Sequence, residues 1–381
     1  MRGNLRKFVV AFLVFVAIVV VAYLSRHRIH LADFTWKKFK GSLAQANIWL
    51  VLASLVAIYG CYAIRALRWQ RFSRSLGSSR FLDVFGGTIM GFAAIFVLGR
   101  PGEPVRPLLL ARKSRSPVAS MFGIWVLERM FDFAAGIALA TLSAWVFASD
   151  LAKAGVDEDS VERFRAAGPL LLGIFLGLTG VMLYFRLHGA GALDRRLKKW
   201  HGERGWRGGV ATAVDGFSQG LQAIRSFSDL VLAVAYTAAH WGLVALVYLM
   251  VCRAFSATFP DTMMNFTGAM LLLAVTLVGS VLQLPGVGGG AQVASIVALT
   301  TIFQLDQEPA LAIAMVLWAI TFASPALVGI PLLIHEGLSL GELRHLAQAE
   351  AKAEEAGEHL SLTGMNWRPP RAESKPGDSA S

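Results

Sequence analysis

Apolar residues along this chain gather in long blocks separated by loops that carry most of the charge. Each of the strongest blocks is near the length of about 20 residues that an α-helix needs to cross a bilayer. These blocks run from Phe8 to Leu24, Asn47 to Leu67, Asp132 to Phe147, Gly168 to Phe185, Leu230 to Val251 and Pro309 to Ile334. The pattern predicts an all-α, polytopic membrane protein with about six full spans.

Two further apolar blocks end in stretches that break a helix. The block from Val84 to Leu98 runs into a cluster of proline and glycine at 100–104, and the block from Phe266 to Leu284 runs into another at 285–290. A short helix is expected after each break, so we interpret both blocks as re-entrant hairpins. Two interrupted hydrophobic segments in corresponding halves are typical of an inverted repeat whose binding site lies near the bilayer midplane.

Composition supports a membrane protein and argues against a nucleic-acid partner. Hydrophobic residues make up 55% of the chain and charged residues only 16%, outside the range of ordinary soluble domains. The net charge of +11 lies mainly in loops, where basic residues meet anionic lipid headgroups. No nucleic-acid-binding motif accompanies it. Cys61 and Cys252 lack the spacing of a metal site and lie in apolar segments, so we expect buried structural thiols and neither a metal nor a cofactor.

Charge in the loops also predicts the orientation of the chain. The loop at 186–207 carries seven arginines and lysines, which marks it as cytoplasmic. Counting spans back places the N-terminus in the cytoplasm and makes the two hairpins enter from opposite sides. The basic stretch around Trp36 would then lie outside, and we interpret it as an interfacial segment. A polar, largely disordered cytoplasmic tail at 335–381 follows a transmembrane domain at 1–334.

Six ionic side chains lie within or beside the apolar blocks. One ion at the centre of a membrane helix costs about 2.5–3.5 kcal/mol, so these side chains must face one another or water. They are Arg100, Glu103, Arg106, Glu128, Arg129 and Asp132. Because their formal charges cancel, a purely structural ion-pair network is one interpretation.

The broken backbone favours a second interpretation, an anion site. Gly102 supplies a flexible entry and Pro104 suits the first position of a helix, so this helix is expected to begin inside the membrane. Its free N–H groups and dipole favour an anion, as does the start of the helix after Gly290. With Arg106 and Arg129, these two helix ends predict a pocket for a lipid phosphate. The candidate substrate-binding residues are Arg100, Gly102, Glu103, Arg106, Glu128, Arg129, Asp132, Pro285, Gly286, Gly288, Gly289, Gly290 and Gln292.

The spacing of Glu128 and Asp132 leaves two options open. Four residues apart on one helical face, two ionised carboxylates repel each other. Either an arginine lies between them or one stays protonated, and the second option would suit proton-coupled transport or a cationic headgroup. His240, beside Trp241, is a candidate for a proton path or, alternatively, a hydrogen-bonded core histidine.

Together these motifs resemble the transmembrane region of lysylphosphatidylglycerol synthase/flippase proteins. The resemblance extends from Phe8 to Ile334 and rests on Gly99 to Glu103 with Arg106, Leu127 to Arg129 with Asp132, and Leu284 to Gly290. It implies a translocator of a lipid or lipid-linked headgroup in the bacterial cytoplasmic (inner) membrane. Bifunctional relatives carry a soluble aminoacyl-transferase domain after this region. We expect neither that domain nor aminoacyl transfer here.

The resemblance also leaves the substrate open. Relatives commonly have an acidic residue in place of Gln292, so a cationic lipid is not favoured. Anionic phospholipids, polyprenyl phosphates and hopanoid-like lipids remain as partners, and a homo-oligomer is also open. The main expectation is a lipid transporter without enzymatic activity. The alternatives are a non-catalytic scaffold or regulator of lipid or envelope synthesis, and a membrane enzyme that acts on a lipid phosphate with Glu103, Glu128 and Asp132 as metal ligands.

Overall fold

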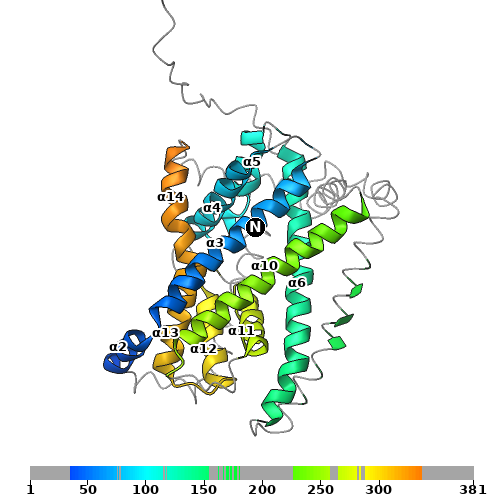
Figure 1. Cartoon of the computed structure of the whole chain (residues 1–381). Coiled ribbons are helices and arrows are strands. Elements are labelled where there is room, and N and C mark those ends of the chain that lie inside the picture. The colour runs from blue at the N-terminus through cyan, green and yellow to red at the C-terminus, as the bar shows by residue number, and fades with distance from the viewer. Residues whose placement is uncertain are drawn as a thin grey trace, which may run out of the picture.

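The computed structural model describes residues 35–74, 76, 79–114, 116, 118–153, scattered positions from 162 to 180, 226–257, 265–280, 283–284 and 288–336. These residues are helical apart from loops and one pair of two-residue strands, so the all-α prediction is confirmed (Figure 1). The elements are α2 (Trp36–Gln45), α3 (Ile48–Ser73), α4 (Phe81–Leu98), the 3-10 helix η2 (Arg100–Gly102), α5 (Val105–Ser114), α6 (Val118–Lys153), α10 (Phe227–Ala254), α11 (Phe266–Gly279), β1 (Gln283–Leu284), β2 (Gly288–Gly289), α12 (Gly290–Thr301), α13 (Gln307–Trp318), the π-helix η3 (Ala319–Ala323) and α14 (Ser324–His335).

Within the described ranges, four helical stretches are long and apolar enough to cross a membrane. Three of them, α3, α10 and the continuous run Gln307–His335, match the predicted spans at 47–67, 230–251 and 309–334. The fourth is α4, which the sequence suggested as one limb of a hairpin. The predicted span at 132–147 forms the middle of the longer helix α6. The predicted span at 8–24, most of that at 168–185 and the tail beyond 336 lie outside the described residues.

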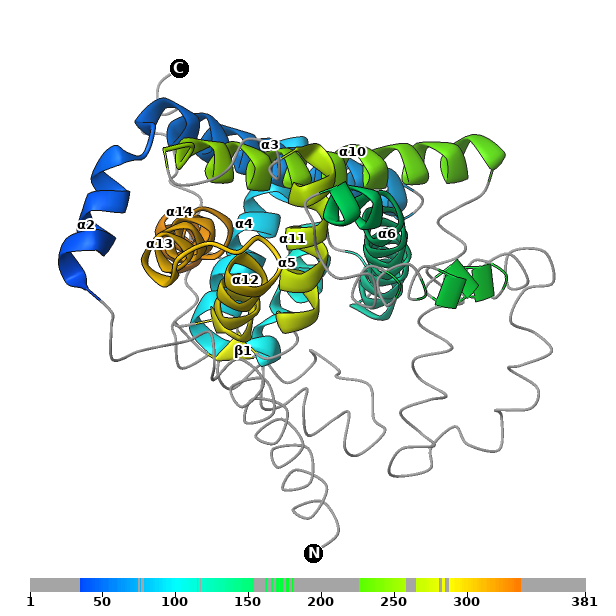
Figure 2. The same cartoon turned by 90° about the horizontal axis from the view of Figure 1, so that it is seen from below.

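Helices α3 and α10 form an antiparallel pair along one side of the bundle (Figure 2). At one end, the backbone N–H of Asn47 donates to the carbonyl of Ala254 at 2.8 Å. At the other end, Arg71 and Asp229 form an ion pair at 2.6 Å. Because the start of each helix meets the end of the other, the first and second halves of the chain run in opposite directions where they meet.

Each half continues into a helical hairpin. In the first, α5 returns along α4, and the chain turns at Gly99, whose φ of 72° is one that glycine adopts without strain. A β-carbon at Gly91 would lie 2.6 Å from the β-carbon of Arg106, so the backbone of α4 at Gly91 lies directly against the base of the Arg106 side chain. In the second, α12 returns along α11, and the strands β1 and β2 pair antiparallel at the turn.

The two hairpins meet at their tips. Arg100, in η2 of the first hairpin, donates from Nη2 to the carbonyl oxygen of Ser280 at the end of α11, at 2.8 Å. The outer helices follow the same scheme, because α14 packs against α4 and α6 packs against α11. The order of helix, hairpin and helix therefore occurs once in each half of the described chain.

Close packing at the first tip yields a testable prediction. A β-carbon at Gly102 would overlap the backbone of Ala94 in α4, so Gly102→Ala should open the hairpin and lower the free energy of unfolding by about 1–3 kcal/mol. The matched control is Gly86→Ala in α4, where nothing lies within 4 Å of the added carbon. Thermal unfolding in detergent should show a lowered midpoint for the first variant only. Equal midpoints would contradict the close approach of η2 to α4.

Candidate functional site

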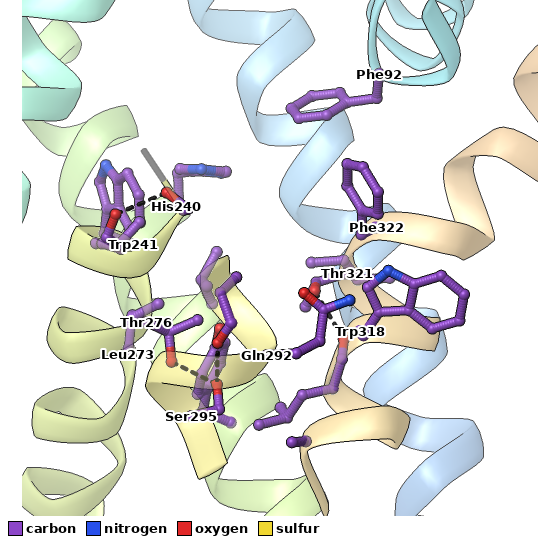
Figure 3. Close-up of a pocket in the computed structure, with 18 of the residues that line it drawn as sticks. Phe92, His240, Trp241, Leu273, Thr276, Gln292, Ser295, Trp318, Thr321 and Phe322 are labelled. Carbon is purple, nitrogen blue, oxygen red and sulfur yellow. Dashed lines mark hydrogen bonds between the residues drawn. The ribbon is translucent and has the colours of Figure 1, made fainter. Parts of the chain in front are cut away.

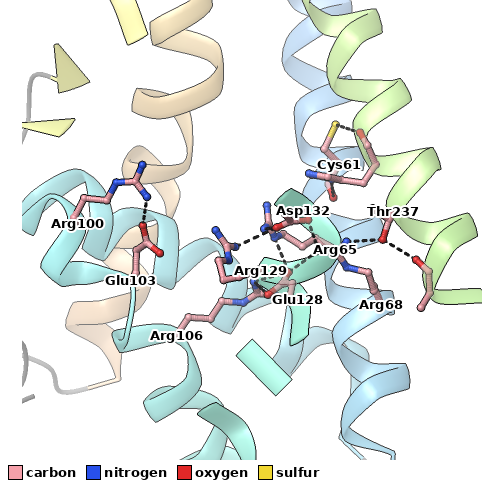
Figure 4. A network of polar contacts seen from close by, with 12 residues as sticks. Cys61, Arg65, Arg68, Arg100, Glu103, Arg106, Glu128, Arg129, Asp132 and Thr237 are labelled. Carbon is pink, nitrogen blue, oxygen red and sulfur yellow. Dashed lines mark hydrogen bonds and ion pairs between the residues drawn. The ribbon is translucent and has the colours of Figure 1, made fainter. Parts of the chain in front are cut away.

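Four arginines and two carboxylates gather between α3, α5 and α6 (Figure 4). We call this group the arginine cluster; it consists of Arg65, Arg68, Arg106, Arg129, Glu128 and Asp132. All are buried except Arg129, whose side chain is 30% exposed. Ions that are buried this close together must pair with one another or bind a ligand.

Glu128 lies at the centre of the arginine cluster. Its Oε1 accepts hydrogen bonds from Arg65 Nε at 2.7 Å and from Arg68 Nη2 at 3.0 Å. Its Oε2 accepts from Arg106 Nη1 at 2.8 Å. One carboxylate of α6 therefore fixes both α3 and the returning limb of the first hairpin.

Asp132 shares two of these arginines. It accepts hydrogen bonds from Arg65 Nη2 and, at 2.8 Å, from Arg68 Nη2, and Arg129 lies 3.4 Å away. Arg65 and Arg68 thus lie between the two carboxylates. Of the two options left open by their spacing, the structure shows the one in which arginine separates them, so both carboxylates act as acceptors.

The charges of the arginine cluster do not cancel. Counting the described residues, four arginines face two carboxylates, which leaves a formal charge of +2. The expected cancellation of three positive and three negative side chains was wrong for two reasons. Arg100 and Glu103 pair with each other at 2.6 Å outside the cluster, and Arg65 and Arg68 join it from α3.

Several donors of the arginine cluster have no hydrogen-bond partner among the described residues. They are Nε and Nη2 of Arg106, Nε of Arg68 and Nε of Arg129. The guanidinium of Arg106 lies over the ring of Trp69 at 4.4 Å, which stabilises the cation but accepts no hydrogen bond in the ring plane. A buried donor without an acceptor costs about 1–3 kcal/mol, and more when it is charged. An anion beside Arg106 would remove this cost.

The remaining predicted site residues that the structure describes lie in the two hairpins. The Arg100 side chain is 44% exposed there, and Gly102 packs against α4. In the second hairpin Gly288 and Gly289 form β2 and Gly290 begins α12, whereas Pro285 and Gly286 lie outside the described residues. The described members of the predicted set are therefore divided between the arginine cluster, the hairpin tips and, for Gln292, the first turn of α12.

Sequence reasoning missed Arg65 and Arg68. Both lie on the face of α3 that is buried against other helices, and Arg68 also donates from Nη1 to Thr237 Oγ1 of α10 at 2.7 Å. The signal that could have found them is their position. Two arginines three residues apart within a continuing apolar helix need buried partners just as Glu128 does.

A cavity of about 230 Å³ lies between the two halves (Figure 3). We call it the central cavity. Its walls come from α3, α4, α10, both limbs of the second hairpin, α13 and η3. Most of the lining residues are apolar or aromatic, and several of the aromatic ones also carry a polar group. The lining residues with a polar group are Tyr62, Arg65, His240, Trp241, Tyr248, Thr276, Ser280, Gln292, Ser295, Trp318 and Thr321. Arg65 therefore connects this cavity to the arginine cluster.

Irregular backbone shapes one wall of the central cavity. At the π-helix η3, the hydroxyls of Tyr62 and Tyr59 donate to the carbonyls of Thr321 and Ser324, each at 3.0 Å. Single π turns of this kind occur frequently at functional sites. On the opposite wall, His240 Nδ1 donates to the carbonyl of Cys61 at 3.2 Å, which agrees with a hydrogen-bonded core histidine.

Comparison with known families identifies the chain. The profile described as the lysylphosphatidylglycerol synthase TM region matches residues 8–329. The chain therefore belongs to this family, which confirms the resemblance seen in its motifs. It is a multi-pass membrane protein, and its family suggests a role in lipid or envelope metabolism. No curated protein matches the chain significantly.

The central position of Glu128 makes a prediction about stability. Glu128→Gln removes the negative charge that three buried arginines share, so it should lower the free energy of unfolding by about 3–5 kcal/mol. Glu103→Gln is the matched control, because its ion-pair partner among the described residues, Arg100, is largely solvated and such pairs contribute about 0–1 kcal/mol. Chemical denaturation of both variants in detergent measures the difference. Equal losses would contradict the arginine cluster as described.

Proposed function

We propose that this member of the lysylphosphatidylglycerol synthase transmembrane family translocates a phospholipid or a lipid-linked phosphate across the bacterial inner membrane. The observation that carries the proposal is the excess positive charge of the arginine cluster. A network that served only to lock helices together would be expected to cancel its charge, because each unpaired buried ion opposes folding. An excess of two charges instead suits a ligand that brings negative charge with it.

Phosphate fits the donors that the arginine cluster leaves unused. A guanidinium presents its N–H groups in a planar fork that matches two phosphate oxygens. Arg106 uses Nη1 for Glu128, and its Nε and Nη2 form an adjacent pair of donors with no acceptor among the described residues. Such a pair is the edge of a guanidinium that binds an oxyanion bidentately.

The helix that carries Arg106 adds to the positive electrostatic potential around this side chain. Helix α5 begins at Val105, directly after the tip of the first hairpin, so Arg106 lies in its first turn. The first N–H groups of a helix have no partner within it, and the helix dipole favours negative charge there. Backbone and side chain therefore attract an anion at the same end of α5.

The arrangement of the two halves supports alternating access. Helices α3 and α10 are antiparallel, each half contains a hairpin, and the hairpins touch at Arg100 and Ser280. We interpret this as an inverted repeat whose hairpins enter from opposite sides and whose halves rock against each other along α3 and α10. In the observed conformation the donors of Arg106 are buried, so this motion must open a path to them. We place both termini in the cytoplasm.

The geometry favours this function over the alternatives. A membrane enzyme would need carboxylates that are free to hold a metal or act as bases. Glu128 and Asp132 instead accept hydrogen bonds from arginines, and the described part of the chain contains no group of three metal-ligating side chains. A scaffold would not need the charge excess.

A transport assay tests the proposal. Full-length protein in vesicles with fluorescently labelled phosphatidylglycerol should accelerate exchange of the label between leaflets, measured by dithionite quenching. Arg106→Met keeps a long side chain but removes the donors, so the rate should fall by about tenfold or more, since a hydrogen bond to a charged group contributes about 1.5–3 kcal/mol. Arg253→Met, at an exposed position of α10, should match the wild type. Exchange no faster than in protein-free vesicles, or an unaffected Arg106→Met variant, would refute the proposal.

A further inference from the structure

Residues of the second half that correspond by position in their helices to members of the arginine cluster line the central cavity. Ala291 is the second residue of α12, as Arg106 is of α5. Counted from the start of α13, Leu317 and Thr321 hold the positions that Glu128 and Asp132 hold in α6. Ala291, Leu317 and Thr321 all line the central cavity. At these matching positions the first half therefore carries ions, and the second half carries neutral residues that border the central cavity.

The lining of the central cavity can form many hydrogen bonds but has only one charged residue, Arg65, among the described residues. Thr276 and Ser295 share a hydrogen bond of 2.9 Å between their hydroxyls at the wall formed by the second hairpin. The indole N–H of Trp318 is buried and has no acceptor among the described residues. Aromatic rings next to hydroxyl and amide groups offer apolar faces and donors to a compact, hydroxylated ligand.

Arg65 joins the two environments. It donates from Nε and Nη2 to Glu128 and Asp132, and no partner of its Nη1 is found in the described part of the chain. Since Arg65 also lines the central cavity, a phosphate beside it would lie between the arginine cluster and the cavity. A group esterified to that phosphate would extend into the cavity.

We propose that the substrate is a lipid phosphodiester whose headgroup is small, uncharged and rich in hydroxyls, with its phosphate beside Arg65 and Arg106, which both donate to Glu128, and its headgroup in the central cavity. This rests on the proposed function and names its substrate class. At about 230 Å³ the cavity is smaller than the range of about 300–1,000 Å³ typical of drug-sized ligands, so it suits a glycerol or a single sugar rather than the lipid chains. Both diacylglycerol and polyprenol lipids carry such headgroups.

Other headgroups fit less well. An ammonium group in the central cavity would lie near Arg65, and no carboxylate among the described lining residues would offset the repulsion. A phosphomonoester such as phosphatidic acid would leave the cavity lining, including the indole N–H of Trp318, without a partner. Recognition should therefore depend on the hydroxylated group as well as on the phosphate.

Binding to the full chain in detergent tests this inference without transport. Isothermal titration would compare dihexanoyl forms of phosphatidylglycerol, phosphatidylethanolamine and phosphatidic acid, together with citronellyl phosphoglucose. We expect phosphatidylglycerol or the phosphoglucose to bind about tenfold or more tightly than the other two, and the tighter of them identifies the lipid class. The inference is overturned if phosphatidylethanolamine or phosphatidic acid binds as tightly as both, or if none of the four binds.

A substitution then locates the preference in the central cavity. Gln292→Glu adds a carboxylate to the lining and should shift the ratio of affinities about tenfold toward phosphatidylethanolamine, whereas Gln45→Glu, at an exposed position of α2, should not. An unchanged ratio of lipid affinities in a folded Gln292→Glu variant would overturn the placement of the headgroup in the central cavity. The comparison of the four lipids on the wild-type protein does not depend on whether this variant folds. A selective binder that fails the vesicle assay would refute only the proposed function. Transport with the opposite headgroup preference would refute only this inference.

Discussion

The pairing of Glu128 with three arginines is the interaction on which the rest of this structure depends. Glu128 lies on α6, Arg65 and Arg68 lie on α3, and Arg106 lies on α5, so one carboxylate joins three helices in the buried interior of the bundle. An ion in such surroundings must find a partner or oppose folding. This requirement holds the first hairpin against the helix pair and places an excess of positive charge beside the contact between the two halves.

The two halves share a plan but differ in chemistry. Each has a helix, a hairpin and a further helix, and the hairpins touch through Arg100 and Ser280. Where α6 of the first half carries Glu128 and Asp132, the corresponding positions of the second half carry Leu317 and Thr321, which line the central cavity. Arg65 borders both environments, so the proposed substrate would place its charged phosphate in one and its neutral headgroup in the other. A symmetric pair of identical sites would not offer this division.

Much of this arrangement can be predicted from the sequence, because ions and helix breaks are rarely compatible with a lipid environment. Ions and glycine–proline breaks inside apolar blocks predicted a helix break after Leu98 and singled out Arg106, Glu128 and Asp132, which the structure brings into one cluster. Which arginine pairs with which carboxylate was harder to predict. Arg65 and Arg68 lie at the end of an apolar block and resemble a flanking basic loop until α3 is seen to continue to Ser73, and which arginine reaches Glu128 depends on helices far apart in the chain. The local pairing of Arg100 with Glu103, three residues apart, could have been anticipated.

On the proposed function, the arginine cluster keeps its positive excess for an anionic lipid. The most direct measurement is a cryo-electron microscopy map of the full chain in nanodiscs that contain phosphatidylglycerol, at a resolution that shows headgroups. We expect density for a phosphate within hydrogen-bonding distance of Arg65 or Arg106, continuous with density in the central cavity. A well-resolved map in which protein carboxylates alone surround these arginines and neutralise them, with the cavity holding only water, would contradict it.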